Sequence, residues 1–434
     1  MKAGKLTKET VWAALSKGST LVFFLLINAA LARILGREAF GAWSYFYAAF
    51  SVVYLASRLG VSDSARVFTA RALGGDIRPP VTAGLLLQVI SSSLFALGLL
   101  ALAGPLCALM DRPDFVLLFR LGALLVFTQS ATDFFKLVFE GLHRLRFTFT
   151  TGFLDYALRL VLIVTLVWAF PQPWAAVTAF IIATALCAAV SFLVLDRRFI
   201  HPAGGYTLRG FSILSMIVYA APMFLSNLGA AVSVELDVLM LGRLTSDAEV
   251  GLFAPAKEIS ARMMHGGVLL AMSTLQVFAR TKEEDLPSLR PLLNRLLCIA
   301  VAFYSVGCVA ILLFAGKIMP LIFGAEFAGS GMPMQLLVPF VFYMSVSRVY
   351  TGILDYRGQA WIRVGYLALS VLLNVVLNLV LIPNFGAAGA ATATSLAYLP
   401  YVILCWVQLR RVFAAAETAQ KNNMESPRID ASTP

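Results

Sequence analysis

The stretch "LGREAFGAWSYFY" (residues 35–47) separates two long apolar segments with an Arg–Glu pair and two glycines. Each flanking segment reaches roughly the 20 residues that an α-helix needs to cross a hydrocarbon core of about 30 Å. Such segments recur along the whole chain, which is 60% hydrophobic and only 13% charged. The sequence therefore predicts an all-α integral membrane protein, because a membrane barrel would show short alternating segments instead.

Twelve segments reach this length, and a short polar or Gly/Pro-containing loop follows each of them. They lie near residues 11–34, 40–59, 81–103, 115–139, 147–169, 174–195, 211–234, 250–278, 291–315, 334–354, 361–382 and 387–409. An even number of transmembrane helices places both ends of the chain on the same side of the membrane.

The positions of Lys and Arg identify that side. The even-numbered gaps and the two tails hold 22 of these residues, whereas the odd-numbered gaps hold four: Arg37, Arg112, Arg243 and Lys317. The positive-inside rule predicts a multi-pass protein with both termini in the cytoplasm. The net charge of +11 then belongs to inner loops, and we expect no nucleic-acid partner.

Cysteine and histidine give no sign of a metal site. The five cysteines stand in apolar segments without a CxxC pair, and none of the three histidines has metal-ligand spacing. We therefore predict no disulfide, no metal and no cofactor.

Two pairs of segments resemble each other across the chain. "ILGREAFGAWSYF" (34–46) resembles "MLGRLTSDAEVGLFAPA" (240–256), and "LRLVLIVTLVW" (158–168) resembles "LNLVLIPNFGA" (377–387). This repeat predicts two pseudo-symmetric six-helix lobes around a central cavity, in which one lobe rocks against the other. The predicted parts are a first lobe at 1–195, a cytoplasmic linker at 196–210, a second lobe at 211–410 and a polar cytoplasmic tail at 411–434.

Glycines of the first pair are expected to let helices fold back tightly at the outer rim of each lobe. These glycines are Gly36 and Gly41 in the first lobe, and Gly242 and Gly251 in the second. The alternative is that such sequences are simply good tight turns with no duplication behind them.

Five stretches, in this order, resemble one known family. They are "LARILGREAFGAWSYF" (31–46), "RLGVSDSARVFTARALG" (58–74), "APMFLSNLGAAVSVELDVLMLGRLTSDAEVGLFAPAKEI" (221–259), "IFGAEFAGSG" (322–331) and "LIPNFGAAGAATATSLAY" (381–398). The chain resembles the bacterial polysaccharide flippases, the Wzx-type translocases of O-antigen repeat units. Their superfamily also contains the lipid II flippases and the multidrug and toxic-compound extruders.

The resemblance implies a twelve-helix transporter of the bacterial inner membrane. It implies translocation of an undecaprenyl-diphosphate-linked oligosaccharide from the inner to the outer leaflet by alternating access, with no bond made or broken. Its partners would be the polyprenyl-linked glycan, membrane lipid and, in addition, a polysaccharide polymerase. Two alternatives stay open: a cation-coupled multidrug extruder and, with less support, an integral-membrane O-antigen polymerase or glycosyltransferase.

Of the 34 Lys and Arg residues, eight remain after the 26 assigned to gaps and tails, and these eight lie within the predicted spans. A charge at mid-bilayer costs roughly 2.5–3.5 kcal/mol on insertion scales. Two of the eight cations, Arg33 and Arg120, lie close enough to helix ends to reach the interface. The other six are candidate ligands for an anionic diphosphate, since Arg and Lys both bind phosphate. They are Lys17, Lys136, Arg159, Lys257, Arg262 and Arg348.

Polar residues of the fourth span form a stripe on one helix face. Gln129, Asp133, Lys136 and Glu140 follow each other at intervals of four, three and four residues. Such a stripe must face a partner helix or water rather than lipid. In the fifth span, Asp155 and Arg159 stand one turn apart, either as a self-neutralising pair or as part of the cavity.

The remaining candidates each have a plain structural alternative. Lys17 is able to reach the interface, and Glu258 and Arg262 are one helical turn apart. Arg58 and Arg66 would collect the diphosphate at the inner mouth, or belong to the ordinary positive-inside signal. Coupling to a cation or proton would use Asp133, Asp155, Glu235 and Asp237, although the last two are also candidate partners of Arg243.

Overall fold

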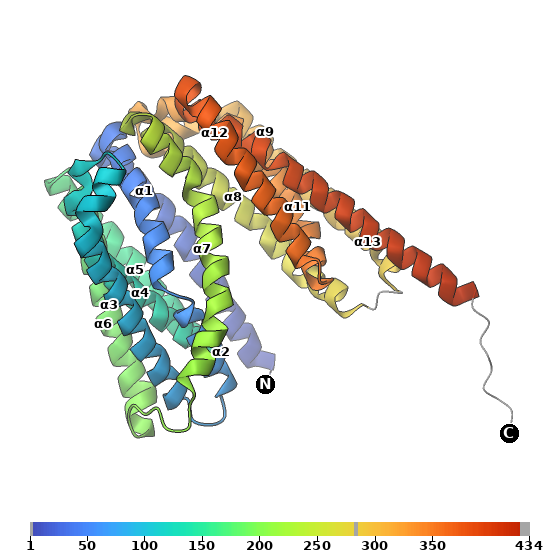
Figure 1. Ribbon diagram of the computed structural model, residues 1–434, viewed down its shortest axis with the longest axis horizontal. Coiled ribbons are helices and arrows are strands. Elements are labelled where there is room, and N and C mark those ends of the chain that lie inside the picture. Colours follow the sequence, from blue (N-terminus) through green and yellow to red (C-terminus); the bar gives the residue numbers. More distant parts are fainter. Residues whose placement is uncertain (1–2, 282–284, 426–434) are drawn as a thin grey trace. The chain divides into compact units, whose positions relative to one another are not determined.

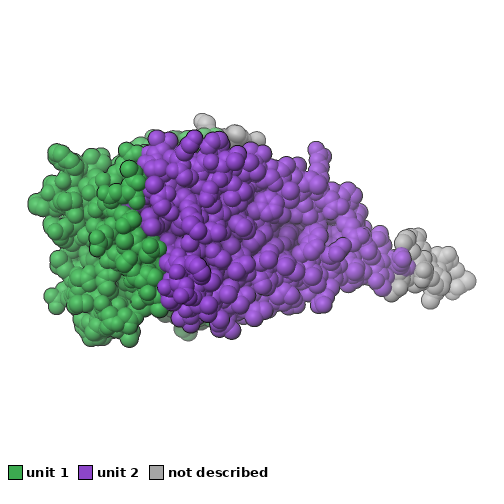
Figure 2. All heavy atoms as spheres, turned by 90° about the horizontal axis from the view of Figure 1, so that it is seen from above, with its two compact units in different colours: residues 1–251, 322–326 green, residues 252–321, 327–434 purple. Residues whose placement is uncertain are grey.

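The computed structural model describes residues 3–281 and 285–425, and these residues form helices joined by short connections, with no β-strand among them (Figure 1). This confirms the prediction of an all-α protein. The chain divides into two compact units, residues 1–251 with 322–326 and residues 252–321 with 327–434 (Figure 2).

Seven long helices belong to the first unit. They are α1 (Ala3–Ser57), α2 (Val61–Arg71), α3 (Arg78–Leu109), α4 (Val116–Gly141), α5 (Leu145–Leu162), α6 (Pro173–Leu195) and α7 (Ile213–Leu244). Short π-helical segments, Ile163–Val167 and Asp196–Ile200, continue α5 and α6. Helix α4 packs against α1, α2, α3, α5 and α6, so its side chains meet most of the unit.

The second unit contains the rest of the helices described. Helix α8 (Asp247–Arg280) begins in the first unit, and α9 (Arg290–Phe323), α10 (Gly331–Leu336), α11 (Val338–Tyr356), α12 (Ala360–Ala397) and α13 (Leu399–Glu425) follow. Helices α11, α12 and α13 pack against one another. Helix α13 continues to Glu425, so part of the predicted polar tail is helical.

Eight helical segments among the described residues are long and apolar enough to cross a membrane, or nine if α10 and α11 form one bent span. Two of the eight, Ala14–Ser57 and Ala360–Thr418, have 44 and 59 residues, far more than the roughly 20 that one crossing needs. Each covers two of the predicted spans. The multi-pass membrane character is thus confirmed, while the count of twelve stays a prediction.

The opening stretch contains a sharp kink rather than a loop. Helix α1 runs through both of the first two predicted spans, and only Gly36, at φ +74° and ψ 175°, leaves the helical conformation. Glycine adopts a positive φ without steric cost. The carboxylate of Glu326 accepts a hydrogen bond from the Arg37 backbone N–H at 2.9 Å, which fixes the chain at this kink.

The two repeated Gly-containing segments contact each other. A Cβ atom on Gly41 would lie 1.8 Å from the carbonyl oxygen of Asp247, and one on Gly251 would lie 2.2 Å from that of Arg37. A Cβ on Gly242 would lie 2.6 Å from the ring of Tyr45. The predicted turning role is therefore correct for Gly36 and wrong for the other three glycines, which lie inside helices and permit close packing.

The compact units and the predicted lobes divide the chain at different points. Helix α7, which the repeat assigns to the second lobe, packs against α1 and α2 of the first unit. Packing and sequence duplication are separate criteria, and the lobe boundaries at 196–210 stay a prediction.

Substitution of Gly41 by Ala should destabilise the protein, because the new methyl group would overlap backbone atoms of α8. Overpacking of this kind costs about 1–3 kcal/mol. Gly98→Ala is the matched control: it lies inside α3, where a new methyl group would have no described neighbour within 4 Å, and it gains helix propensity. Thermal melting of the purified variants in detergent measures the difference. Equal melting temperatures would contradict the close contact.

Candidate functional site

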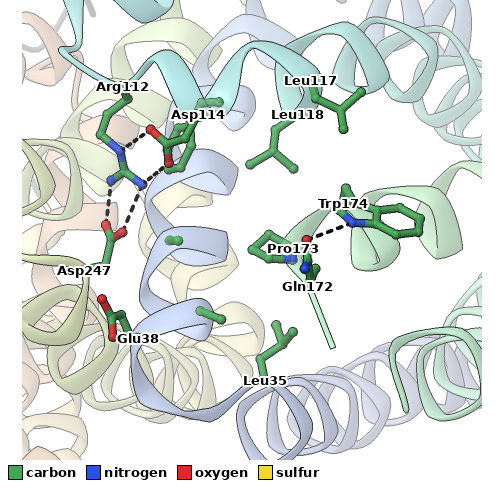
Figure 3. A pocket seen from close by; sticks show the side chains of 13 residues that line it. Leu35, Glu38, Arg112, Asp114, Leu117, Leu118, Gln172, Pro173, Trp174 and Asp247 are labelled. Atoms are coloured by element: carbon green, nitrogen blue, oxygen red, sulfur yellow. Dashed lines mark hydrogen bonds and ion pairs between the residues drawn. The ribbon is translucent and has the colours of Figure 1, made fainter. Parts of the chain in front are cut away.

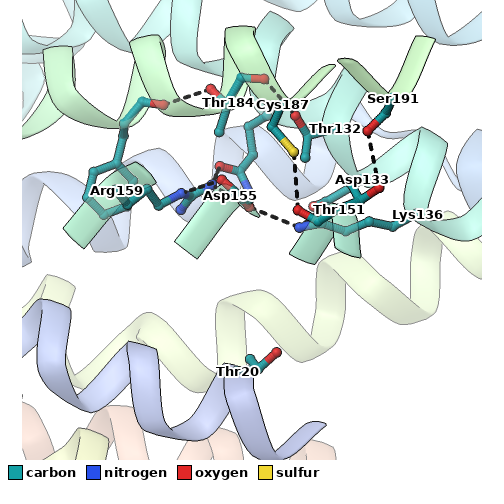
Figure 4. Close-up of polar contacts among 12 residues, drawn as sticks. Thr20, Thr132, Asp133, Lys136, Thr151, Asp155, Arg159, Thr184, Cys187 and Ser191 are labelled. Carbon is teal, nitrogen blue, oxygen red and sulfur yellow. Dashed lines mark hydrogen bonds and ion pairs between the residues drawn. The ribbon is translucent and has the colours of Figure 1, made fainter. Parts of the chain in front are cut away.

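The polar stripe of α4 faces a cluster of charges inside the first unit. The Lys136 ammonium lies 3.0 Å from the Asp155 carboxylate of α5 and 3.4 Å from Asp133, one turn away on its own helix (Figure 4). Tyr54 of α1 donates a hydrogen bond to Asp133. Three helices thus contribute to the site, which agrees with the expectation that the stripe faces partner helices.

Arg159 completes the cluster from α5. Its Nε donates to Asp155 at 2.8 Å and its Nη2 donates to the side-chain oxygen of Gln129 at 2.6 Å. The predicted one-turn pair of Asp155 and Arg159 is therefore confirmed. Asp155 and Arg159 are only 1% and 4% exposed, so both charges are held inside protein.

Aromatic rings cover the two cations. The Arg159 guanidinium lies 4.5 Å from the centroid of Phe180, and the Lys136 ammonium lies 5.5 Å from that of Tyr156. A ring face attracts a cation most strongly where water is excluded. These contacts lower the free-energy cost of burying two positive charges.

The cluster is balanced in charge, with two cations and two carboxylates. Its members differ in access: the Lys136 and Asp133 side chains are 17% and 23% exposed, whereas Asp155 and Arg159 are buried. An anion approaching this site would reach Lys136 before Arg159. The arrangement makes Asp155 the central group, since it contacts both cations.

A second cluster of charges surrounds Asp63 of α2. The Asp63 carboxylate is shared by Arg58, which precedes α2, and by Arg66 of α2. The distances from their guanidinium nitrogens are 3.6 and 3.9 Å. Arg66 also lies 3.5 Å from Glu140, the last member of the α4 stripe, and Asn227 of α7 donates to Asp63 at 3.1 Å. This cluster thus joins α2, α4 and α7.

Beside this cluster lies a pocket of about 560 Å³. Arg66, Arg71 and His143 line it together with Glu140 and apolar side chains. Arg71 also packs over the rings of Phe68 and Tyr219. The pocket carries more positive than negative groups, which suits an anion.

The other candidate cations are distributed over both units. Lys17 is exposed on α1, Lys257 is half-buried on α8, and Arg348 is exposed on α11. The predicted pair of Glu258 and Arg262 is confirmed at 3.3 Å. In the first unit, Glu235 is half-buried and Asp237 is buried on α7.

A further cluster at the α3–α4 connection was not predicted. Arg112 forms ion pairs with Asp114 at 2.7 Å and with Asp247, the first residue of α8, at 2.6 Å (Figure 3). Its guanidinium also lies over the ring of Phe115, 3.8 Å from the ring centroid. Burial opposes the charge of Arg112, but the hydrogen bonds that its guanidinium donates to the Asp114 and Asp247 carboxylates outweigh this effect and raise the pKa of Arg112. Arg243 forms an ion pair with Asp111 of the same connection, a partner the sequence did not suggest.

Potential metal ligands among the described residues are His, Cys, Asp and Glu side chains. Among the side chains that the structure describes, there is no group of three or more His, Cys, Asp or Glu residues that could hold a metal ion.

Removal of the Asp155 carboxylate should lower the free energy of unfolding far more than removal of an exposed carboxylate. Asp155→Ala removes the carboxylate that Lys136 and Arg159 share. Breaking a buried ion pair by removal of one partner destabilises a protein by about 3–5 kcal/mol. Asp76→Ala is the control, because Asp76 pairs at 2.8 Å with Arg78 in an exposed connection. Melting temperatures in detergent should fall strongly for the first variant and little for the second. Similar losses would contradict the central role of Asp155.

Comparison with known proteins identifies the family. A family described as "Polysaccharide biosynthesis protein" matches residues 6–278. Two relatives come from Haloferax volcanii. The "Probable flippase AglR" is 26% identical over 84% of this chain and 75% of its own, and the "Probable low-salt glycan biosynthesis flippase Agl15" is 25% identical over 44% and 40%. The alignment thus spans less than half of Agl15.

Two solved structures share the fold. An inward-facing multidrug resistance MATE family transporter of the MOP superfamily superposes with a TM-score of 0.70 at 17% identity, over 94% of this chain and 99% of its own. The lipid II flippase MurJ in an inward closed conformation gives 0.66 at 14% identity, over 95% and 91%. The family match covers more than half of the chain and agrees with the resemblance seen in the sequence motifs, so the protein belongs to the polysaccharide biosynthesis protein family.

Proposed function

We propose that the protein is a flippase that moves an undecaprenyl-diphosphate-linked oligosaccharide from the inner to the outer leaflet of the cytoplasmic membrane by alternating access. The observation that carries this proposal is family membership over residues 6–278. The names of both Haloferax relatives, which call them flippases, support it. A diphosphate and a glycan are too polar to cross hydrocarbon, so a protein must offer them a polar route.

The first contact in this proposal is made at the pocket of Arg66 and Arg71. The charge distribution predicts that this side faces the cytoplasm, where the lipid-linked glycan is made. Arginine suits this task because its planar fork bonds phosphate oxygens in pairs. Arg58 holds Asp63 in place and keeps Arg66 at the rim of the pocket.

The second contact is made at Lys136, the accessible cation of the buried cluster. Arg159 acts on it indirectly: it binds Asp155, and Asp155 in turn positions Lys136. We assign Lys17, Lys257, Arg262 and Arg348 to later positions along the route, as further contacts for the headgroup.

The equal number of positive and negative charges in this cluster offers a way to couple transport to proton binding. Asp133 lies farther from Lys136 than Asp155 does, and it is the more exposed of the two carboxylates. A proton on Asp133 would cancel one negative charge and leave Asp155 as the one carboxylate shared by Lys136 and Arg159, so that the cluster carries a net positive charge that attracts phosphate. Loss of that proton would restore the ion pair and release the phosphate, while Asp155 keeps Arg159 neutralised. Glu235 and Asp237 on α7 are second candidates for the coupling cation.

A cation-coupled multidrug extruder is the competing function. The paired charges and the aromatic rings around Lys136 and Arg159 favour it, because such a transporter would use buried carboxylates and aromatic side chains. The fold of the MATE transporter is compatible with either function. An O-antigen polymerase has less support, since the predicted outer loops are short.

Gene disruption with leaflet-resolved labelling tests the proposal. A flippase mutant should accumulate polyprenyl-linked glycan on the cytoplasmic side and lose surface polymer. Unchanged surface polymer with new sensitivity to drugs would overturn the flippase assignment and support the extruder.

Lys136→Gln should lower glycan translocation about tenfold, equivalent to about 1.4 kcal/mol, because it replaces the accessible cation with a neutral polar side chain that is one bond shorter. Lys317→Gln is the matched control, as Lys317 is an exposed lysine in a predicted outer connection. Translocation is measured from surface polymer in the disrupted strain, and immunoblots of membranes confirm equal protein levels. Full complementation by Lys136→Gln would remove this residue from the route.

A further inference from the structure

The second unit contains a small pocket that takes no part in the proposed route. It has a volume of about 300 Å³ and lies between the first turn of α9 and the middle of α13. Its lining residues are Arg290, Leu293, Asn294, Trp406, Leu409, Arg410 and Phe413.

The lining has two chemically distinct parts. Leu293, Leu409 and Phe413 are buried and form an apolar floor. Arg290 and Arg410 are exposed at the rim, one from each helix, and Asn294 is exposed beside them. A molecule that fits this pocket should therefore combine a negative group with apolar surface.

The position of the pocket along the helices is equally informative. Arg290 and Arg410 directly flank the predicted spans at 291–315 and 387–409, both on the side where the basic loops gather. Trp406 lies one turn from Arg410, and tryptophan is enriched at the membrane–water boundary. In the predicted topology, the pocket would therefore lie at the depth of lipid headgroups on the cytoplasmic side.

From this arrangement we propose that the pocket binds the phosphate headgroup of an anionic glycerophospholipid of the inner leaflet. The two guanidinium groups would bond the phosphate oxygens, and the Asn294 amide would donate a further hydrogen bond. The glycerol backbone and the first acyl carbons would lie over the apolar floor. Basic pockets between helices on the cytoplasmic side are a recurring form of anionic-lipid site.

One carboxylate competes with the lipid for this site. Glu417 on α13 lies 2.8 Å from Arg290, and the two side chains are 39% and 51% exposed. An ion pair this open to solvent is weak. A phosphate that is held by Arg410 as well can displace Glu417 from Arg290, so the pair leaves the site available.

Binding is tested on the purified full-length protein in a neutral detergent. Phosphatidylglycerol is titrated against phosphatidylcholine, and bound lipid is counted by native mass spectrometry. Phosphatidylglycerol should bind more tightly, and Arg410→Ala should weaken it about fivefold, as expected for one cation beside an anionic headgroup. Arg411→Ala is the matched control, because Arg411 is an exposed neighbour that does not line the pocket.

Glu417→Gln should act in the opposite direction and tighten phosphatidylglycerol binding about threefold, since it removes the competing charge. This variant keeps the test decisive if Arg410→Ala reduces folding. Glycerol 3-phosphate alone, in a third titration, should bind much more weakly than the lipid.

Three results would overturn the assignment. One is equal binding of the two phospholipids, and another is equal loss in Arg410→Ala and Arg411→Ala. The third is glycerol 3-phosphate that binds as tightly as the lipid, which would indicate a site for soluble phosphate compounds. None of these measurements depends on transport, so the flippase proposal can fail while this site stands.

Discussion

The structure of the first unit depends on the cost of holding charge away from water. Asp155 lowers this cost for two cations at once, because it accepts hydrogen bonds from both Arg159 and Lys136. Gln129 and Phe180 complete the surroundings of Arg159. The result is a charge-balanced centre that joins α4 and α5. Any transport chemistry in this unit has to begin from that neutral state, so an incoming anion must exchange partners rather than fill a vacant positive site.

This balance changes how the embedded cations are interpreted. From the sequence alone they form a surplus of positive charge within the membrane, which favours an anionic cargo. In the folded protein, carboxylate partners are present for the embedded Lys136, Arg159 and Arg262, and also for Arg58 and Arg66 of the predicted inner mouth. For the proposed diphosphate cargo, binding would then depend on which ion pairs can open, and the more exposed members of each cluster are the ones that can do so at low cost.

Much of the fold and some of the site follow from local patterns. Hydrophobic length predicts the membrane helices, and one-turn spacing predicts the pairs Asp155–Arg159 and Glu258–Arg262, because both features repeat with the helix itself. Contacts between distant segments leave no such pattern. The bonds of Tyr54 to Asp133 and of Arg112 to Asp247 join residues 79 and 135 positions apart, and only the packing of the helices brings them together. The role of the glycines in helix packing is also not predictable from the sequence. Glycine is common in turns, and the sequence does not distinguish a turn from a close contact between helices.

The kink in the first helix has a consequence for how the protein is made. Its backbone is held by a carboxylate 289 residues farther along the chain. At about 5–20 residues per second, a ribosome needs roughly 15 to 60 s to synthesise that distance. During this interval the kinked helix α1 is without its final restraint, so folding of the first unit is complete only after Glu326 has been synthesised.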